Sequence, residues 1–208
     1  MYLPTHFKLE NLDDLYQLIQ DYPLASLMVV TDGEIEANHI PLELDRQIGE
    51  FGVLKGHIAK ANPLASLLKQ PLSAYVVFQA EQNYISPNWY EGKQEHHRVV
   101  PTWNYRVVHV KGQIKLMEDD QYLRGVLACL TRTHEESQEN PWRMGDAPND
   151  FIAEQLEKVA AIEIKICSIV GKFKVSQNRS EADIHNISKA LQDSNPEMVA
   201  SIQKYYPQ

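Results

Sequence analysis

The sequence is poor in the features that mark several common classes of protein, and cysteine is the first of these. Only 2 of its 208 residues are cysteines, Cys129 and Cys167, and each stands alone inside an apolar, periodic segment. A small domain held together by disulfides needs a denser cysteine pattern. We therefore expect two buried, reduced thiols rather than a disulfide framework, a metal pair or a nucleophile.

Long apolar runs are also missing. No window approaches the roughly 18 apolar residues of a membrane-spanning helix. The first seven residues, Met1 to Phe7, lack the basic region and the following apolar block of a secretion signal. The expectation is a cytoplasmic protein without a membrane segment.

Positive charge is scarce as well. The chain has 20 Lys and Arg against 28 Asp and Glu, which gives a formal net charge of -8. A chain of this charge is repelled by phosphate backbones and by anionic lipid, so a nucleic-acid partner would need a local basic face. No basic run is present, and charge therefore argues against direct DNA binding.

Metal-ligand patterns and phosphate loops are the last absences. Glu95, His96 and His97 form a polar cluster, but neighbouring residues on an extended chain point to opposite faces and no third ligand stands at a useful spacing. The glycine-rich loop with its Lys-Ser/Thr pair is missing too. We expect neither a metal site nor a nucleotide-binding loop of that type.

What the sequence does contain is enough apolar residues, 43%, for one main core with an appendage. Adjacent hairpin signals without regular βαβ alternation favour an antiparallel barrel over a parallel sheet. The Asp32-Gly33 pair predicts a tight hairpin turn, and Gly112 predicts a bulge. Alternation and capping signals predict strands at 24–31, 35–44, 51–61, 72–80, 99–117 and 162–170, and helices at 11–21, 119–133, 149–160, 180–192 and 197–206.

Two clusters combine a tryptophan with short polar side chains. Trp89 stands near Ser86, and Trp103 stands between Thr102 and Asn104. Flat apolar faces beside hydroxyl and amide groups suit a planar heteroaromatic ligand. The same residues are equally compatible with structural aromatics beside capping side chains, and this alternative stays open.

A second candidate site lies where a predicted strand leads into a helix. Asn62 followed by Pro63 is typical of a helix start, and His57 and Lys60 lie just upstream. The positive end of a helix and a nearby lysine favour a phosphate. A capped helix with a solvated lysine is the alternative.

Several motifs together resemble one known family. They are Met1-Tyr2-x-Pro4, Gly56-His57-Ile58-Ala59-Lys60-Ala61-Asn62-Pro63, Tyr84-Ile85-Ser86-Pro87-x-Trp89-Tyr90, Val100-Pro101-Thr102-Trp103-Asn104-Tyr105 and Lys172-Phe173-Lys174-Val175-Ser176-Gln177-Asn178. In this order, from end to end of the chain, they resemble the PaiB family of FMN-binding negative transcriptional regulators. The resemblance implies an α+β fold, an antiparallel split β-barrel similar to the pyridoxamine phosphate oxidases, with inserted and C-terminal helices. It also implies a homodimer with FMN at the subunit interface.

The resemblance assigns roles to thirteen residues. It places the FMN phosphate on the second and third strands and the following helix start, and the flavin ring and ribityl chain on the aromatic clusters, with two later residues closing the site. The phosphate set is His39, His57, Lys60, Ala61, Asn62 and Ser66; the ring set is Ser86, Trp89, Thr102, Trp103 and Asn104; the closing pair is Ser176 and Gln177.

Three functions remain open. The first is an FMN protein, and if it is an enzyme, an FMN-dependent oxidoreductase, since the cofactor itself supplies the chemistry. The second is a repressor that binds DNA through the helices of a C-terminal extension, residues 179–208, which follows a flavin-binding domain at 1–178. The last of these helices offers Lys204 as its sole cation, which is few for a groove-reading helix. The third is a split barrel that has lost its cofactor.

Overall fold

The chain forms two compact units, each assembled from separate segments. The computed structural model describes residues 1–93 and 97–206, so the predicted polar cluster is described only at His97, and Glu95 and His96 lie outside the described residues. Unit 1 comprises residues 1–18, 79–109 and 170–208. Unit 2 comprises residues 19–78 and 110–169. The predicted boundary at residue 178 stays a prediction; in the structure, the C-terminal helices belong to the same unit as the N-terminal segment.

Unit 2 is built on an antiparallel sheet with the strand order β3-β2-β6-β7-β8-β5-β4. The strands are β2 (Leu24–Thr31), β3 (Glu34–Pro41), β4 (Glu43–Asp45), β5 (Val53–Ala59), β6 (Leu72–Ile85), β7 (Thr102–Met117) and β8 (Val159–Lys174), of which the last three also contribute residues to unit 1.

The sequence signals at the start of this sheet are confirmed. Asp32 and Gly33 both have positive φ, 52° and 82°, as a tight hairpin turn of the favoured type requires. The turn fixes the β2–β3 register, in which Ser26 lies opposite His39. Pro41, which cannot donate a ladder hydrogen bond, lies on β3 at the edge of the sheet, where its missing N–H leaves no ladder bond unmade.

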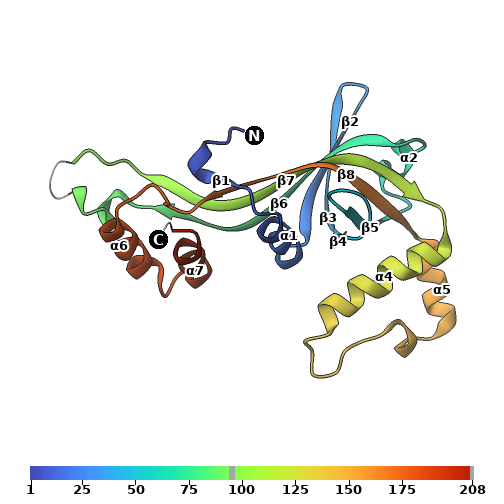
Figure 1. Cartoon of the computed structure of the whole chain (residues 1–208). Coiled ribbons are helices and arrows are strands. Elements are labelled where there is room, and N and C mark those ends of the chain that lie inside the picture. Colours follow the sequence, from blue (N-terminus) through green and yellow to red (C-terminus); the bar gives the residue numbers. More distant parts are fainter. Residues whose placement is uncertain (94–96, 207–208) are drawn as a thin grey trace. The chain divides into compact units, whose positions relative to one another are not determined.

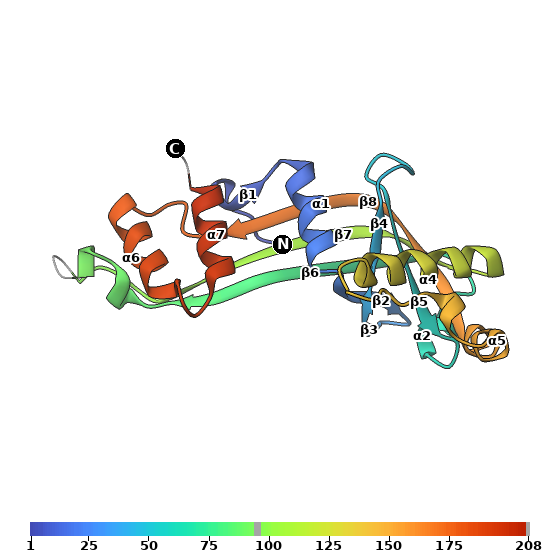
Figure 2. The same ribbon diagram turned by 90° about the horizontal axis from the view of Figure 1, so that it is seen from below.

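Three α-helices accompany the sheet in unit 2: α2 (Pro63–Leu67), α4 (Asp120–Glu135) and α5 (Asn149–Glu157), with a short 3-10 turn η3 (Met144–Asp146) before α5. Asp119 caps α4 by accepting the amide of Tyr122 at 2.9 Å. The apolar stripe of α4 is buried, and α4 packs against β5 (Figure 2). The helix predicted at 119–133 is therefore confirmed in type and position.

Unit 1 combines the remaining parts of β6, β7 and β8 with short N-terminal elements and two C-terminal helices (Figure 1). A two-stranded pairing joins β1 to β8, with Lys8 opposite Lys172. The further elements of this unit are η1 (Thr5–Phe7), β1 (Lys8–Leu9), most of α1 (Leu12–Asp21), η2 (Pro87–Trp89), α6 (Glu181–Leu191) and α7 (Pro196–Tyr205).

The helices α6 and α7 lie side by side and seal the apolar core of unit 1 (Figures 1 and 2). Ser180 caps α6 and Asn195 caps α7. The core has members at the end of β6, directly after η2 and β8, and on both helices: Ile85, Tyr90, Val175, Ile184, Ile187, Leu191, Met198, Val199 and Ile202. The apolar face of each helix is therefore used in packing, which supports a structural role for the two helices.

A buried ion pair also links β6 and β7 within unit 1. Arg106 on β7 donates from Nε and from one terminal nitrogen to the two carboxylate oxygens of Glu81 on β6, at 2.6 and 2.7 Å. The Glu81 side chain is only 3% exposed. Ser201 of α7 donates its hydroxyl to the same carboxylate at 2.5 Å. A bidentate arginine and a third donor satisfy the buried charge of Glu81.

Two local predictions differ from the structure. Cys167 is exposed, because β8 alternates and places Ile162, Ile164 and Ile166 inward but Cys167 outward. Gly112 lies in an uninterrupted strand instead of a bulge. A Cβ at Gly112 would meet the carbonyl oxygen of Lys165 at 2.5 Å, so the glycine is required by the close approach of β7 and β8.

Several strand bounds differ from the prediction. The strand predicted at 51–61 is shorter, Val53–Ala59, and the strand predicted at 99–117 begins at Thr102. The strand predicted at 72–80 continues to Ile85, and the strand predicted at 162–170 runs from Val159 to Lys174. The predicted strand 35–44 is interrupted at Leu42, whose amide donates to the carbonyl of Pro23 at 2.9 Å. Across the described part of the chain, none of the helices is both long and apolar enough to cross a membrane.

Candidate functional site

The thirteen residues assigned from the resemblance fall into two groups, one in each unit, and each group has its own geometry. Unit 2 holds His39, His57, Lys60, Ala61, Asn62 and Ser66; unit 1 holds Ser86, Trp89, Thr102, Trp103, Asn104, Ser176 and Gln177.

In unit 2, the helix start behaves as the sequence predicts, but its amides are already used. The side chain of Asn62 accepts the amide of Leu64 at 2.9 Å, and the carbonyl of Asn62 accepts the amide of Ala65. Pro63 has no N–H, and α2 is only five residues long. Asn62 also donates to Asn38 of β3 at 2.7 Å, so its side chain holds β3 and α2 together. Anion binding here therefore depends on Lys60, which is exposed.

The two histidines of this group differ in their exposure and in their hydrogen bonds. His39 is exposed, and its Nδ1 lies 3.1 Å from the hydroxyl of Ser26. His57 is half-buried, and among the described residues its buried Nδ1 has no hydrogen-bond partner. Burial lowers the pKa of His57, so the ring is neutral at pH 7 and can accept or donate one hydrogen bond. An unsatisfied buried nitrogen of this kind is available to a ligand.

In unit 1, the two tryptophans have separate surroundings. Trp103 is 53% exposed, and its ring meets that of Tyr84 edge to face at 6.0 Å. Trp89 lies in η2, where Ser86 caps the turn, and it packs against the core formed with α6 and α7. The structure therefore leaves Trp103 accessible to a planar ligand, whereas Trp89 is partly used in packing.

Asn104 and Ser176 form a buried pair within unit 1. Their side chains are 1% and 4% exposed, and each donates to the other, at 2.8 and 3.2 Å. Ser176 has a φ of 68°, a left-handed conformation that is uncommon for serine and that the surrounding hydrogen bonds must hold. Gln177 contributes to this by accepting the Val175 amide and donating to the Phe173 carbonyl.

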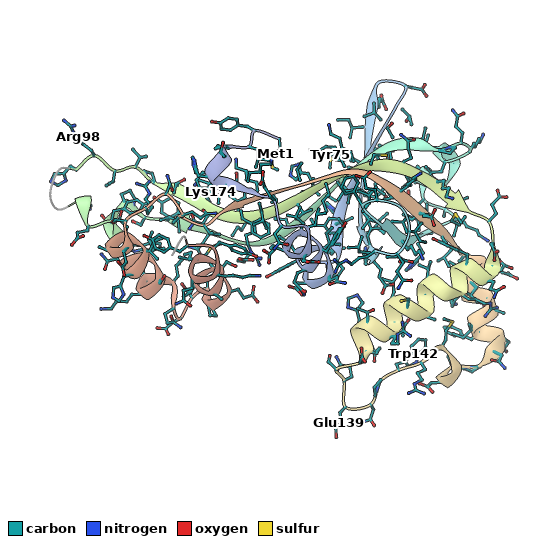
Figure 3. All side chains as sticks on the ribbon, in the orientation of Figure 1. Met1, Tyr75, Arg98, Glu139, Trp142 and Lys174 are labelled. Carbon is teal, nitrogen blue, oxygen red and sulfur yellow. The ribbon has the colours of Figure 1, made fainter. Side chains whose placement is uncertain are left out.

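Sequence reasoning missed three cations beside this pair. Lys172 and Lys174 alternate on β8 and so share a face, and Arg179 follows the Ser176 turn with its amide bonded to the Ser176 carbonyl at 3.0 Å. The period-two spacing of the lysines was the available signal. Lys174, labelled in Figure 3, donates to the hydroxyl of Thr102 and to the carbonyl of Trp103, both at 2.5 Å.

Lys174 and Arg179, together with the Asn104–Ser176 pair, line a small cavity of about 140 Å³. Burial lowers the pKa of Lys174, and the charges of Lys172 and Arg179 lower it further. The lining residues are Phe7, Thr102, Asn104, Lys174, Ser176, Asn178 and Arg179.

A larger cavity of about 540 Å³ lies in unit 2, between β4, β5 and α4. Two of its lining groups are paired with carboxylates: Lys55 with Asp45 at 2.7 Å, and the Tyr122 hydroxyl with Glu163 at 2.7 Å. Burial and the hydrogen bond to Glu163 raise the pKa of Tyr122. Burial and the hydrogen bond to Glu43 raise the pKa of Cys129, so this thiol is not an activated nucleophile. None of the sequence-predicted site residues lines this cavity.

The antiparallel sheet with its inserted and C-terminal helices defines an α+β protein of the split β-barrel class. The fold matches the solved structure of an FAD- and heme-binding protein from Mycobacterium smegmatis, with 19% identity, a TM-score of 0.62, and coverage of 86% of this chain and 79% of that one. This confirms the fold predicted from the sequence.

The comparison of structures identifies the fold, and the comparison of sequences identifies the family. The family described as a putative FMN-binding domain matches residues 1–168, and the chain belongs to this family. The chain is 29% identical over 197 residues to the protease synthase and sporulation protein PAI 2 of Bacillus subtilis, covering 94% of this chain and 92% of that protein. It is 31% identical over 218 residues to an uncharacterised protein of Emericella nidulans, covering 88% and 87%. The cofactor that the family description names is FMN, as predicted.

The residues present fit a flavin nucleotide in their chemistry. Unit 2 offers the unsatisfied His57 Nδ1 and the exposed ammonium of Lys60. Unit 1 offers the accessible faces of Trp103 and Tyr84. A phosphate needs a cation, which unit 2 offers, and isoalloxazine needs flat apolar contacts, which unit 1 offers, so each unit by itself matches the chemistry of one part of the nucleotide. No group of three His, Cys, Asp or Glu side chains arranged for a metal occurs among the residues that the structure describes.

Proposed function

We propose that the chain is a homodimeric FMN protein in which a second copy completes the flavin site. The observation that carries the proposal is the family match over residues 1–168. The exposure of Trp103 and Tyr84 supports it, because a large aromatic pair left open on one copy is a surface that a ligand or a partner covers. When bound, the flavin supplies electron or hydride transfer, and the protein need only position it and exclude competing reactions.

Within this function, Lys60 provides the charge for the FMN phosphate, and His57 provides one neutral hydrogen-bonding nitrogen. Asn62 acts by holding α2 to β3 through its bond to Asn38. Trp103 provides a face for the isoalloxazine ring.

The first experiment is to purify the protein and record its visible spectrum and its sedimentation. A yellow protein absorbing near about 450 nm that releases FMN on denaturation supports the proposal. A colourless protein that takes up no added FMN refutes it, and favours a split barrel without a cofactor. Sedimentation of the FMN-bound protein as a monomer would remove the shared site but leave FMN binding intact.

A regulatory role is the second candidate, because the Bacillus subtilis relative is named for protease synthesis and sporulation. Direct DNA reading by α7 has little support. Lys204, the cation of that helix, pairs with Asp14 at 2.6 Å, and the apolar face of α7 is in the core. A mobility shift on upstream DNA that persists at about 150 mM salt would contradict this view.

A further inference from the structure

We propose that unit 1 contains an oxyanion site, separate from the Lys60 region, that binds a phosphate-sized dianion. The site is the cavity between β7, the end of β8 and the Ser176–Arg179 turn, with Lys174 and Arg179 as its charged ligands. Neither cation is among the thirteen residues that the resemblance assigns to FMN.

The charge balance around the cavity is the first argument. The chain carries a net charge of -8, yet three cations, Lys172, Lys174 and Arg179, gather here. Within residues 1–93 and 97–206, none of the three forms an ion pair with a carboxylate. The carboxylate of Asp183, which follows Arg179 in the sequence, instead accepts the amide of Glu91 at 2.9 Å. Uncompensated cations of this kind attract an anion from solution.

The contacts of the cations leave donors for a ligand. Lys172 is 9% exposed and lies over the rings of Tyr2 and Tyr105, so it contributes charge but is covered by aromatic groups. Lys174 uses two of its three N–H donors on Thr102 and Trp103, which leaves one. The guanidinium of Arg179 stacks on the Tyr90 ring at 4.4 Å, a contact that leaves its in-plane donors available. Thr102, which accepts from Lys174, keeps its own hydroxyl proton to donate.

The backbone geometry supports a functional reading. Ser176 holds its left-handed conformation inside the unit, fixed by the buried pair with Asn104. The single hydroxyl proton of Ser176 is donated to Asn104, so Ser176 has none left for an anion and is a positioning residue, not a ligand. Its carbonyl accepts the Arg179 amide, which sets the turn that carries the guanidinium. A strained residue held by a buried polar pair is typical of a functional site.

The size of the cavity decides the class of ligand. A volume of about 140 Å³ has room for about four or five water molecules at roughly 30 Å³ each. Sites for ligands of flavin size usually measure about 300 to 1,000 Å³. The cavity therefore has room for a phosphate or sulfate group and is smaller than the usual site of an isoalloxazine ring. The phosphate can come from FMN itself or from a separate oxyanion, and the two sources are distinguished below.

The test is a titration of flavin-free protein with sulfate at constant ionic strength, followed by calorimetry. Wild-type protein should bind one sulfate per chain with saturation. Lys174→Met and Arg179→Met should each weaken it by roughly tenfold or more, because each removes a charged hydrogen bond. Lys189→Met, which removes an exposed lysine on α6 of the same unit, should leave sulfate binding unchanged.

Three results would overturn the site: wild-type protein that shows no saturable sulfate binding, sulfate binding unaffected by both cavity variants, or equal weakening by Lys189→Met. Thermal unfolding of each variant checks that it folds. If Lys174→Met does not fold, Arg179→Met and Arg179→Lys carry the test, the latter retaining the charge but losing the fork.

A second arm identifies the source of the phosphate, and this arm alone rests on the proposed function. If sulfate competes with FMN and not with riboflavin, and Arg179→Met weakens FMN alone, the cavity holds the FMN phosphate. If flavin-saturated protein binds sulfate as well as the stripped protein does, the oxyanion belongs to another ligand. Protein that binds sulfate but no flavin refutes the proposed function and leaves the oxyanion site standing.

Discussion

Unit 1 and unit 2 each contain a cavity lined by charged groups, and the two cavities differ in whether their cations are paired with carboxylates. In unit 2, Lys55 pairs with Asp45, and the carboxylate of Glu43 accepts hydrogen bonds from Cys129 and Thr133. In unit 1, the cations at the cavity have aromatic rings and neutral oxygens around them instead of carboxylates. The unit 2 cavity of about 540 Å³ therefore has a neutralised lysine, whereas the unit 1 cavity of about 140 Å³ has cations without carboxylate partners, and uncompensated charge is what attracts an anion.

The largest expected effect is the difference in the free energy of unfolding that is lost when the ion pair of each unit is broken. Arg106→Leu leaves Glu81 buried without its cation, and we expect a loss of about 3–5 kcal/mol in the free energy of unfolding. Lys55→Met breaks the Lys55–Asp45 pair, whose side chains are 22% and 30% exposed, and should cost about 1 kcal/mol or less. Chemical denaturation of both variants measures the difference. Similar losses for the two would show that burial does not separate these pairs.

Alanine substitutions at glycines that lie close to another segment should give a smaller difference in stability between the two units. Gly112→Ala forces a Cβ against the Lys165 carbonyl, a backbone atom, so we expect a loss of about 1–3 kcal/mol. In unit 1, a Cβ at Gly171 would meet the end of the Leu15 side chain, which can shift, so Gly171→Ala should cost less. Gly125→Ala is the control: a Cβ on this position of α4 meets nothing within 4 Å, and alanine should be neutral or stabilising. Thermal melts that order the three differently would contradict the steric argument.

A third prediction asks which unit holds the phosphate of FMN. If Lys60 does so, Lys60→Ala should weaken FMN by roughly tenfold and leave riboflavin unchanged, because only FMN carries the phosphate. Lys69→Ala, at another exposed lysine of unit 2, is the matched control. Fluorescence titration with both flavins gives the affinities. Equal loss of both flavins would remove the role given to Lys60. Unchanged FMN binding would show that Lys60 does not hold the phosphate, and Arg179→Met then tests the unit 1 cavity.

The smallest expected effect is a pH dependence confined to unit 1. Burial and the neighbouring cations Lys172 and Arg179 lower the pKa of Lys174 below its ordinary value of 10.5. A bound dianion favours the protonated lysine, so sulfate affinity should be constant at lower pH and fall as pH rises through this lowered pKa. Sulfate stays a dianion throughout, and measurements above pH 7 avoid His109, whose pKa is lowered by burial, by the N-terminus and by Lys172.

Calorimetry of wild type and of Lys174→Met from pH 7 to 10 measures whether sulfate affinity falls as pH rises. The variant should bind weakly with a flat pH profile, whereas Arg179→Met should bind weakly and keep the slope. Affinity that rises with pH in the wild type, or a slope that survives in Lys174→Met, would show that another group titrates.

The local elements of this protein followed from the sequence by itself. The Asp32-Gly33 turn, the Asn62-Pro63 helix start and the α4 stripe depend on residues a few positions apart, and such short-range preferences do not need the rest of the chain. The family motifs are likewise visible in the sequence itself, and the resemblance that they carry predicts FMN as the cofactor. Strand ends were less predictable, because the length of β6 and β8 depends on partners far away in the chain.

Only the tertiary structure decided which polar residues act together. Thr102 and Lys174 are separated by 72 positions, as are Asn104 and Ser176, and they meet because β7 pairs with β8. The sequence showed each lysine and amide but not which carboxylates would neutralise them. Charge compensation depends on distances of a few ångströms, and those distances are set by strand pairing and burial.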